Sequence, residues 1–278
     1  MKAPYRLASR DSNKTTVVQV GDVCIGDGSF VTIAGPCAIE NRNQIERTAA
    51  FVAGHGAQIL RGGAYKPRTS PYDFQGLGDI GVVLITAAGE NSGLPTVVEA
   101  LSEENLPMLS KHIDMIQIGA RNMQNFALLR AAARTGKPIL LKRAASATLD
   151  ELLYAAEYIL VDGNSQVVLC ERGVRGFDAH TRNLFDLAGA IRLKELTHLP
   201  VIADPSHATG RASLVEPLVL ASAAAGLDGS MVEVHPEPTS ALSDGPQSLD
   251  FASFERLTAR LAMLSSTGEP KFAGLGCR

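Results

Sequence analysis

The densest group of chemically useful side chains lies in the segment 60–76, LRGGAYKPRTSPYDFQG. Arg61, Lys66 and Arg68 fall within eight residues there, between glycines and prolines that control the backbone. Cations held this close together repel one another, so a stiff loop that gathers them needs an anion. Phosphate is the usual anion for such a group of Arg and Lys. The alternative is a solvated basic surface loop, but such loops rarely carry so much glycine and proline.

Short apolar runs, each followed by a helical pattern, predict the elements that must position this loop. Continuous apolar runs are typical of parallel strands that are buried on both faces. We expect strands at 30–34, 57–60, 95–99, 115–118, 138–142, 167–170, 200–203 and 230–233. Helices are expected at 43–53, 79–91, 103–111, 125–135, 148–161, 182–196, 212–225 and 251–264.

This arrangement indicates the α/β class and a (β/α)8 TIM barrel. No GxGxxG follows the first strand, which weakens the case for an open dinucleotide-binding sheet. The chain should divide into a tail and short β-hairpin at 1–29, a catalytic barrel at 30–265 and a C-terminal tail at 266–278.

Catalytic residues of such a barrel come from the C-terminal ends of its strands. Eight of the 26 basic residues follow those ends, although the net charge of the chain is -3. They are Arg61, Lys66, Arg68, Arg121, Lys142, Arg143, Arg172 and Arg175. Ion pairs with Glu99, Glu171 and Asp204 are the alternative use, but these cations outnumber those acids. We therefore expect one or two phosphorylated ligands.

A second group at the strand ends could bind a metal. Cys37, His207, Glu233 and Asp244 offer one sulfur, one nitrogen and two carboxylates, a set that suits a divalent transition metal. The first three follow the first, seventh and eighth strands, which are neighbours in a closed barrel. Taken singly, Cys37 could be a small buried apolar residue, His207 a helix cap and Glu233 the partner of an arginine.

Lys142, at the end of the fifth strand, has a competing interpretation. A buried lysine in a barrel can form a Schiff base with a carbonyl substrate, and Arg143 beside it is compatible with that chemistry. Both residues fit a phosphate clamp equally well.

The composition argues against several classes of protein. The acidic balance disfavours a nucleic-acid partner, and aromatic content of 5% without Trp disfavours base stacking. The first residues contain no apolar signal segment, and no run is long enough for a membrane span. The four cysteines lack CxxC spacing, so we expect thiols in a reducing cytoplasm.

Several motifs together resemble the short bacterial (type I beta) 3-deoxy-arabino-heptulosonate 7-phosphate (DAHP) synthases, over about residues 16–265. They are AGPCAIE, LRGGAYKPRTSPYDFQGLG, QIGARNMQNF, LLKR, LCERGVR, TRN, DPSHATGR and EVHPEPTSALSDGPQSL. The related 3-deoxy-octulosonate 8-phosphate synthases typically carry a KANRSS-type loop where this chain has KPRTSP.

The resemblance implies a transferase that condenses phosphoenolpyruvate (PEP) with erythrose 4-phosphate in the first step of the shikimate pathway. It implies a divalent metal ion (Mn, Fe, Co or Zn) and a homo-oligomer, either dimer or tetramer. The implied metal ligands are Cys37, His207, Glu233 and Asp244. The implied PEP clamp is Arg61, Lys66, Arg121, Lys142 and Arg172. The implied sugar-phosphate site is Arg68, Thr69 and Ser70. Lys66 is the expected proton donor to the aldehyde oxygen, and Glu99 or a metal-bound water is expected to offset positive charge on the reacting PEP.

Departures from the family pattern leave other functions open. Ala144 stands where glycine is usual, and VVEA, CERGVRGFD and TRNLFDL also differ. A divergent paralogue that uses another phosphorylated aldehyde, a Schiff-base aldolase and a non-catalytic anion-binding barrel are the alternatives. Residues 1–29 are too few for a regulatory module, so we expect no feedback inhibition by aromatic amino acids.

Overall fold

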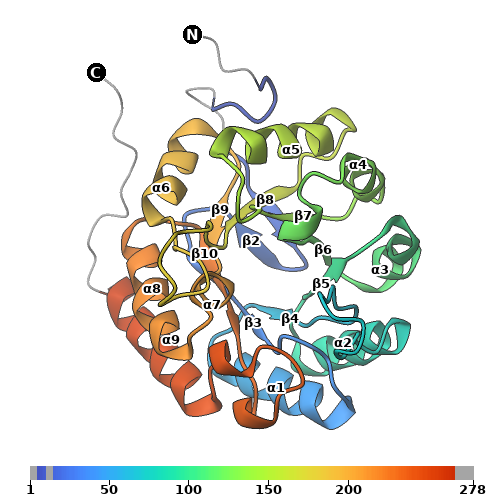
Figure 1. The fold of residues 1–278 in the computed structure, drawn as a ribbon, viewed down its shortest axis with the longest axis vertical. Coiled ribbons are helices and arrows are strands. Elements are labelled where there is room, and N and C mark those ends of the chain that lie inside the picture. Colours follow the sequence, from blue (N-terminus) through green and yellow to red (C-terminus); the bar gives the residue numbers. More distant parts are fainter. Residues whose placement is uncertain (1–4, 11–14, 267–278) are drawn as a thin grey trace.

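A computed structural model describes residues 5–10 and 15–266 of the chain. Its centre is a closed barrel of parallel strands in the order β10-β3-β4-β5-β6-β7-β8-β9, and helices surround it (Figure 1). The strands are β3 (Val31–Gly35), β4 (Ile59–Arg61), β5 (Thr96–Ala100), β6 (Met115–Ile118), β7 (Ile139–Lys142), β8 (Val167–Glu171), β9 (Val201–Ala203) and β10 (Gly229–Glu233). The predicted (β/α)8 barrel is confirmed.

The outer ring consists of helices that alternate with the strands. They are α1 (Arg42–Gly54), α2 (Asp79–Ser92), α3 (Leu106–His112), α4 (Phe126–Arg134), α5 (Leu149–Val161), α6 (Leu187–Leu196), α8 (Ala212–Ala224) and α9 (Phe251–Ser266). A short additional helix, α7 (Pro205–Thr209), follows β9.

One predicted helix begins later than expected. The apolar pattern predicts a helix from residue 182, whereas α6 begins at Leu187, where the Asp186 side chain accepts the backbone N–H of Gly189 at 2.7 Å. Ahead of this cap, the backbone N–H groups of Arg182 and Asn183 donate to carbonyl groups of α7. These bonds to another loop hold the segment in an irregular conformation and leave Arg182 at the mouth of the barrel.

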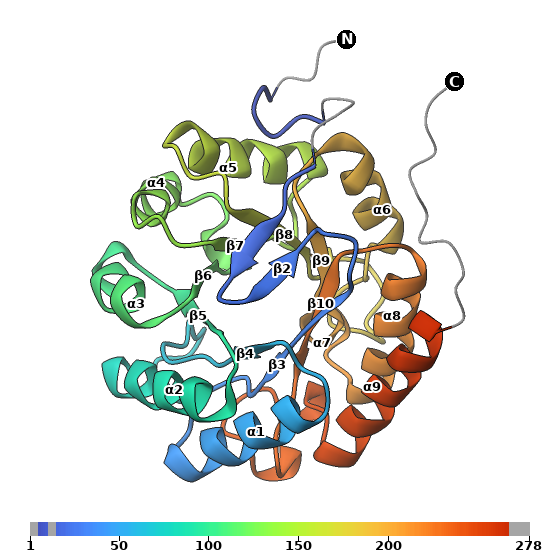
Figure 2. The same ribbon diagram turned by 180° about the vertical axis from the view of Figure 1, so that it is seen from behind.

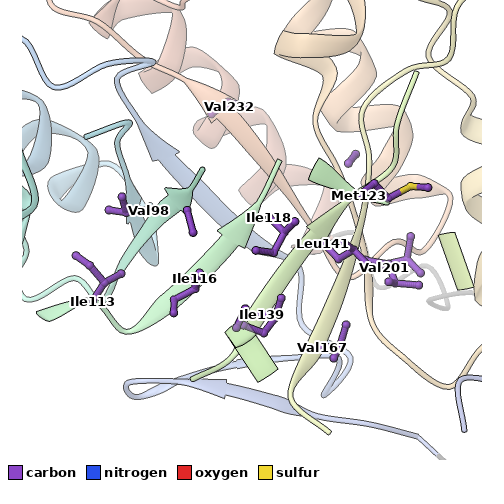
Figure 3. Close-up of a cluster of buried hydrophobic side chains, with 14 of the residues drawn as sticks. Val98, Ile113, Ile116, Ile118, Met123, Ile139, Leu141, Val167, Val201 and Val232 are labelled. Carbon is purple, nitrogen blue, oxygen red and sulfur yellow. The ribbon is translucent and has the colours of Figure 1, made fainter. Parts of the chain in front are cut away.

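Each strand directs alternate side chains to two separate apolar layers. The outer layer lies between strands and helices, and Figure 3 shows part of it, including Val98 of β5 and Leu141 of β7. The inner layer fills the barrel and includes Val97 and Leu140 from the same strands. This period of two is the ordinary geometry of a strand, and it decides which side chains face the barrel axis.

The hairpin of β1 (Val18–Val20) and β2 (Val23–Ile25) covers the N-terminal end of the barrel (Figure 2). Val18, Val20 and Ile25 are fully buried in the inner apolar layer. The predicted N-terminal hairpin is thus confirmed. Because apolar side chains fill this end, a ligand must enter from the C-terminal ends of the strands.

The inner positions become polar near the C-terminal ends of the strands. Five polar residues each follow, two positions later in the same strand, an apolar residue of the inner layer. They are Arg61, Glu99, Gln117, Lys142 and Glu233. Strand alternation therefore turns these five polar side chains toward the barrel axis. They form a polar layer directly above an apolar one.

No helix within residues 5–10 and 15–266 is both long and apolar enough to cross a membrane. The tail predicted at 266–278 lies, apart from its first residue, outside the described residues.

We predict that Glu216 stabilises the packing of α9 against α8 in a pH-dependent way. This carboxylate of α8 accepts hydrogen bonds from Arg260 and Arg256 of α9. Burial would raise the pKa of Glu216, but the two guanidinium groups lower it below its ordinary value of 4.5. Its contribution to stability is therefore present above that value and is lost as the pH falls through the folded-state pKa.

Glu216→Gln should lower the free energy of unfolding at neutral pH by up to about 1 kcal/mol, since both arginines are half exposed. Denaturant titration should be done at neutral pH and at about one pH unit below the ordinary carboxyl pKa. The difference in the free energy of unfolding between wild-type and Glu216→Gln should be smaller at the acid pH. Glu46→Gln, which breaks an exposed pair with Arg42, is the matched control and should change stability less. An equal effect of Glu216→Gln at both pH values would contradict the prediction.

Candidate active site

Glu233, at the end of β10, is a carboxylate with 0% solvent exposure. It accepts hydrogen bonds from Arg61 at 2.6 Å and from Gln247 at 2.5 Å, and Nε2 of His207 lies 3.1 Å away. Burial alone would raise the pKa of Glu233, but the charges of His207 and Arg61 lower it well below its usual range. Glu233 is therefore a negative charge held in place from three sides.

Asp204, which follows β9, is the second carboxylate with 0% exposure. Its Oδ2 atom accepts a hydrogen bond from Lys142 and lies 2.7 Å from Nδ1 of His207. Its Oδ1 atom accepts the backbone N–H of His207 at 3.0 Å and so caps α7. Burial would raise the pKa of Asp204, but His207 and Lys142 lower it.

His207 thus lies between two buried carboxylates, one at each ring nitrogen. Burial would lower the pKa of His207, but Asp204 and Glu233 raise it to about 10. The surroundings of the imidazole therefore favour positive charge at this point of the barrel.

Cys37 and Asp244 complete the group from two further loops. Sγ of Cys37 lies 3.2 Å from Oδ2 of Asp244 and 3.0 Å from Nζ of Lys66. Burial would lower the pKa of Lys66, but Cys37 and Glu233 raise it. Gly63 permits Lys66 to approach Cys37, because a Cβ atom at position 63 would lie 2.8 Å from Cδ of Lys66.

One donor atom from each of four residues meets in this region, and all four atoms lie within 4.8 Å of one another. The residues are Cys37, His207, Glu233 and Asp244. A thiol, an imidazole and two carboxylates form a donor set typical of divalent transition metals. The raised pKa of His207 agrees with this, because a bound cation can take the place of the proton that the two carboxylates attract.

A cavity of about 710 Å³ opens beside this group at the C-terminal ends of the strands. Its basic lining residues are Lys66, Arg68, Arg121, Lys142, Arg172, Arg175 and Arg182. Its acidic lining residues are Asp73, Glu99 and Asp244. This excess of positive charge suits ligands with several negative charges.

Most residues that the sequence predicts for substrate binding line this cavity, namely Lys66, Arg68, Thr69, Glu99, Arg121, Lys142 and Arg172. Two do not line it. Arg61 lies below, bonded to Glu233, and Ser70 sits in the loop with its hydroxyl accepting the N–H of Tyr72. Direct contact of Arg61 and Ser70 with a substrate stays a prediction.

Arg143 does not line the cavity, although the sequence groups it with seven other basic residues at the strand ends. Its guanidinium donates to Glu171 at 2.8 Å and to Asp186 at 2.9 Å. Glu171 alternates with the inward-facing Cys170 along β8, so its carboxylate points outward between strand and helix. The three residues therefore connect β7, β8 and the start of α6.

The sequence suggested Asp204 only as a possible ion-pair partner of the strand-end cations, as it is for Lys142, and suggested no role for Gln117, Gln247 or Arg182. Strand alternation could have identified Gln117, which donates to Glu99 at 3.0 Å. Gln247 and Arg182 lie inside the motifs SDGPQSL and TRN, but no local pattern shows what their side chains contact. Asp204, which follows β9, bonds to Lys142 of β7, two strands away, and no periodic signal in the sequence shows which cation it meets.

Comparison with known proteins identifies relatives over nearly the whole chain. The DAHP synthetase I family matches residues 10–268. The phospho-2-dehydro-3-deoxyheptonate aldolase of Thermotoga maritima is 49% identical over 94% of this chain and 78% of that protein. The 2-dehydro-3-deoxyphosphooctonate aldolase of Trichlorobacter lovleyi is 29% identical over 91% of this chain and 98% of that protein.

Solved structures agree with these sequence matches. The crystal structure of the Thermotoga maritima DAHP synthase superimposes with a TM-score of 0.92 and covers 95% of this chain and 78% of that one. A truncated form of the Thermotoga maritima synthase gives a TM-score of 0.87 at 45% identity, with coverage of 94% and 96%.

Proposed function

The chain belongs to the DAHP synthetase I family, and from this premise we propose that it condenses PEP with erythrose 4-phosphate. The products are 3-deoxy-arabino-heptulosonate 7-phosphate and inorganic phosphate, which makes the protein a 3-deoxy-7-phosphoheptulonate synthase of the shikimate pathway. The observation that carries the proposal is a strongly cationic cavity directly beside a four-donor group. A reaction that joins two phosphorylated substrates needs such cations, and an aldehyde electrophile needs such a group.

We propose that Cys37, His207, Glu233 and Asp244 hold a divalent ion of Mn, Fe, Co or Zn. When bound, the ion supplies Lewis acidity to the aldehyde oxygen. Glu233 is held for this role by Arg61, and His207 by Asp204.

The PEP clamp is assigned to Lys66, Arg121, Lys142 and Arg172 around the cavity. The phosphate and carboxylate of PEP both need charge-assisted hydrogen bonds, and clamping them fixes C3 toward the aldehyde carbon. Arg121 also donates to the carbonyl of Pro67 at 2.9 Å, which links the clamp to the loop after β4. Arg61 is bonded to Glu233 below the cavity, and its direct contact with PEP, which the family resemblance implies, stays a prediction.

Lys66 is proposed as the proton donor to the aldehyde oxygen, and the distance of 3.0 Å between its Nζ atom and Sγ of Cys37 supports this role. The new bond forms between C3 of PEP and the aldehyde carbon, water then adds at C2, and phosphate leaves from C2. Positive charge at C2 is offset by Glu99. Its carboxylate can lie over the end of β6 because Gly119 has no side chain: a Cβ there would be 1.9 Å from Oε1.

The loop after β4 is proposed to hold the phosphate of the sugar through Arg68, Thr69 and Ser70. Pro67 and Pro71 restrict its backbone. The Arg68 guanidinium donates to the carbonyls of Phe74 at 2.9 Å and of Leu242 at 3.3 Å, which ties the loop to itself and to the loop after β10.

A Schiff-base mechanism is not favoured. The amine of Lys142 is bonded to Asp204, which is fully buried. A neutral lysine would leave that carboxylate without one of its compensating charges, at a cost of several kcal/mol. The cytoplasmic location and the dimeric or tetrameric state stay predictions from the sequence.

We predict that Cys37→Ala abolishes both metal retention and PEP consumption while the fold persists. The thiolate is the softest of the four donors, and its loss leaves an incomplete ligand set. Metal analysis after gel filtration and circular dichroism would test this. Cys24→Ala, in the hairpin and away from the group, is the matched control and should retain metal and activity. Full activity of the wild-type protein after exhaustive chelation would contradict the assignment.

We further predict that erythrose 4-phosphate is used well ahead of arabinose 5-phosphate. The restricted loop sets the distance from the sugar phosphate to the metal group, and a longer aldehyde would misplace its carbonyl. A misplacement of about 1 Å can cost on the order of a hundredfold in rate. Turnover of PEP against a panel of phosphorylated aldehydes, with and without chelator, measures the preference and tests the proposed function itself.

Arg68→Ala should erode this preference, while the KM for PEP, measured in the same assays, serves as the internal control and should change little. Equal or better turnover of arabinose 5-phosphate by the wild-type protein would show that the loop does not set the specificity.

A further inference from the structure

We propose that Arg182 is a positioning residue that fixes which carboxylate oxygen of Asp244 faces the metal group. The proposal rests on the metal site of the proposed function. Nη2 of Arg182 lies 3.0 Å from Oδ1 of Asp244, whereas Oδ2 lies 3.2 Å from Sγ of Cys37. The two oxygens thus have separate partners, one on the rim and one in the donor group.

Asp244 needs such restraint because its backbone is strained. Its φ of 52° is the one positive value among the non-glycine residues that the structure describes. A non-glycine residue keeps this conformation only where its surroundings hold it. The carbonyl of Asp244 accepts hydrogen bonds from the N–H of Gln247 and the hydroxyl of Ser248, which fix the main chain. Those bonds leave the carboxylate free to rotate, and the contacts of its two oxygens with Arg182 and Cys37 restrict that rotation.

Arg182 can act as an anchor because its own main chain is fixed. Its N–H donates to the carbonyl of Thr209 at 2.9 Å, and the next residue, Asn183, donates to Ala208 at 2.8 Å. Gly210 makes room for it, since a Cβ atom there would lie 3.1 Å from Cβ of Arg182. The carbonyls that hold Arg182 belong to α7, the helix that carries His207. Arg182 therefore connects α7, which bears His207, with the loop that bears Asp244.

A simpler role for Arg182 is that of one more cation for substrate phosphate, since its side chain lines the cavity and is 44% exposed. The two roles predict opposite effects on metal affinity. Removal of a positive charge near a metal ion lowers repulsion, so a purely electrostatic role predicts equal or tighter metal binding in Arg182→Gln. A positioning role predicts weaker binding, because the ligand oxygen is no longer held.

The test measures the dissociation constant for Mn²⁺ on the purified full chain by competition with a chelator. Arg182→Gln should bind Mn²⁺ about 10- to 100-fold more weakly, the usual effect of removing a group that orients a metal ligand. Arg182→Lys should show a smaller loss, because it keeps the charge but not the planar donor group. Arg175→Gln removes a charge from the same cavity and is the matched control, with metal affinity unchanged or slightly higher.

Metal affinity in Arg182→Gln that equals or exceeds that of the wild-type protein would overturn the proposal while leaving the metal site intact. Wild-type protein that neither binds Mn²⁺ nor consumes PEP with erythrose 4-phosphate would instead overturn the proposed function, and this inference with it. Thermal unfolding of each variant without metal confirms that the fold is retained, as expected for a half-exposed side chain.

Discussion

The site depends on the compensation of two carboxylates that the barrel buries completely, Asp204 and Glu233. An unpaired carboxylate in a protein interior costs several kcal/mol, so each must be surrounded by cations or hydrogen-bond donors. Arg61 and Gln247 meet Glu233, Lys142 meets Asp204, and His207 lies between the two. Both ring nitrogens thereby face buried carboxylates, which determines where a metal ion could sit before any ligand arrives.

These pairs divide the cations of the barrel mouth into two kinds. Arg61 and Arg143 are buried and bonded to carboxylates that the fold itself supplies. Others, such as Arg121 and Arg172, line the open cavity, where basic residues outnumber acidic ones. The first kind holds the framework rigid, and the second leaves a positive field that attracts and orients anionic substrates. A rigid framework matters because small displacements at a reacting centre are costly.

Sequence patterns could predict the barrel and much of the site, since parallel strands bring their C-terminal ends to one edge. That rule is enough to predict, from their positions in the chain, that Cys37, His207 and Glu233 belong to one metal site. It could not separate Arg143 from Lys142, because the direction of each side chain depends on strand alternation and on where the strand ends. Nor could it find Arg182, because an apolar helical pattern runs past the true start of α6 and hides the loop that bonds to α7.

The apolar layer inside the barrel explains why these electrostatic contacts carry so much weight. Leu140 lies one strand period below Lys142, and Met231 lies one period below Glu233. The hairpin closes the barrel beneath them with Val18, Val20 and Ile25. Among the described residues, apolar side chains thus separate the polar layer from the N-terminal end of the barrel, and the lower dielectric strengthens each ion pair while raising the cost of breaking one. The hairpin, at the opposite end of the barrel from the site, thus helps set the strength of the charges there.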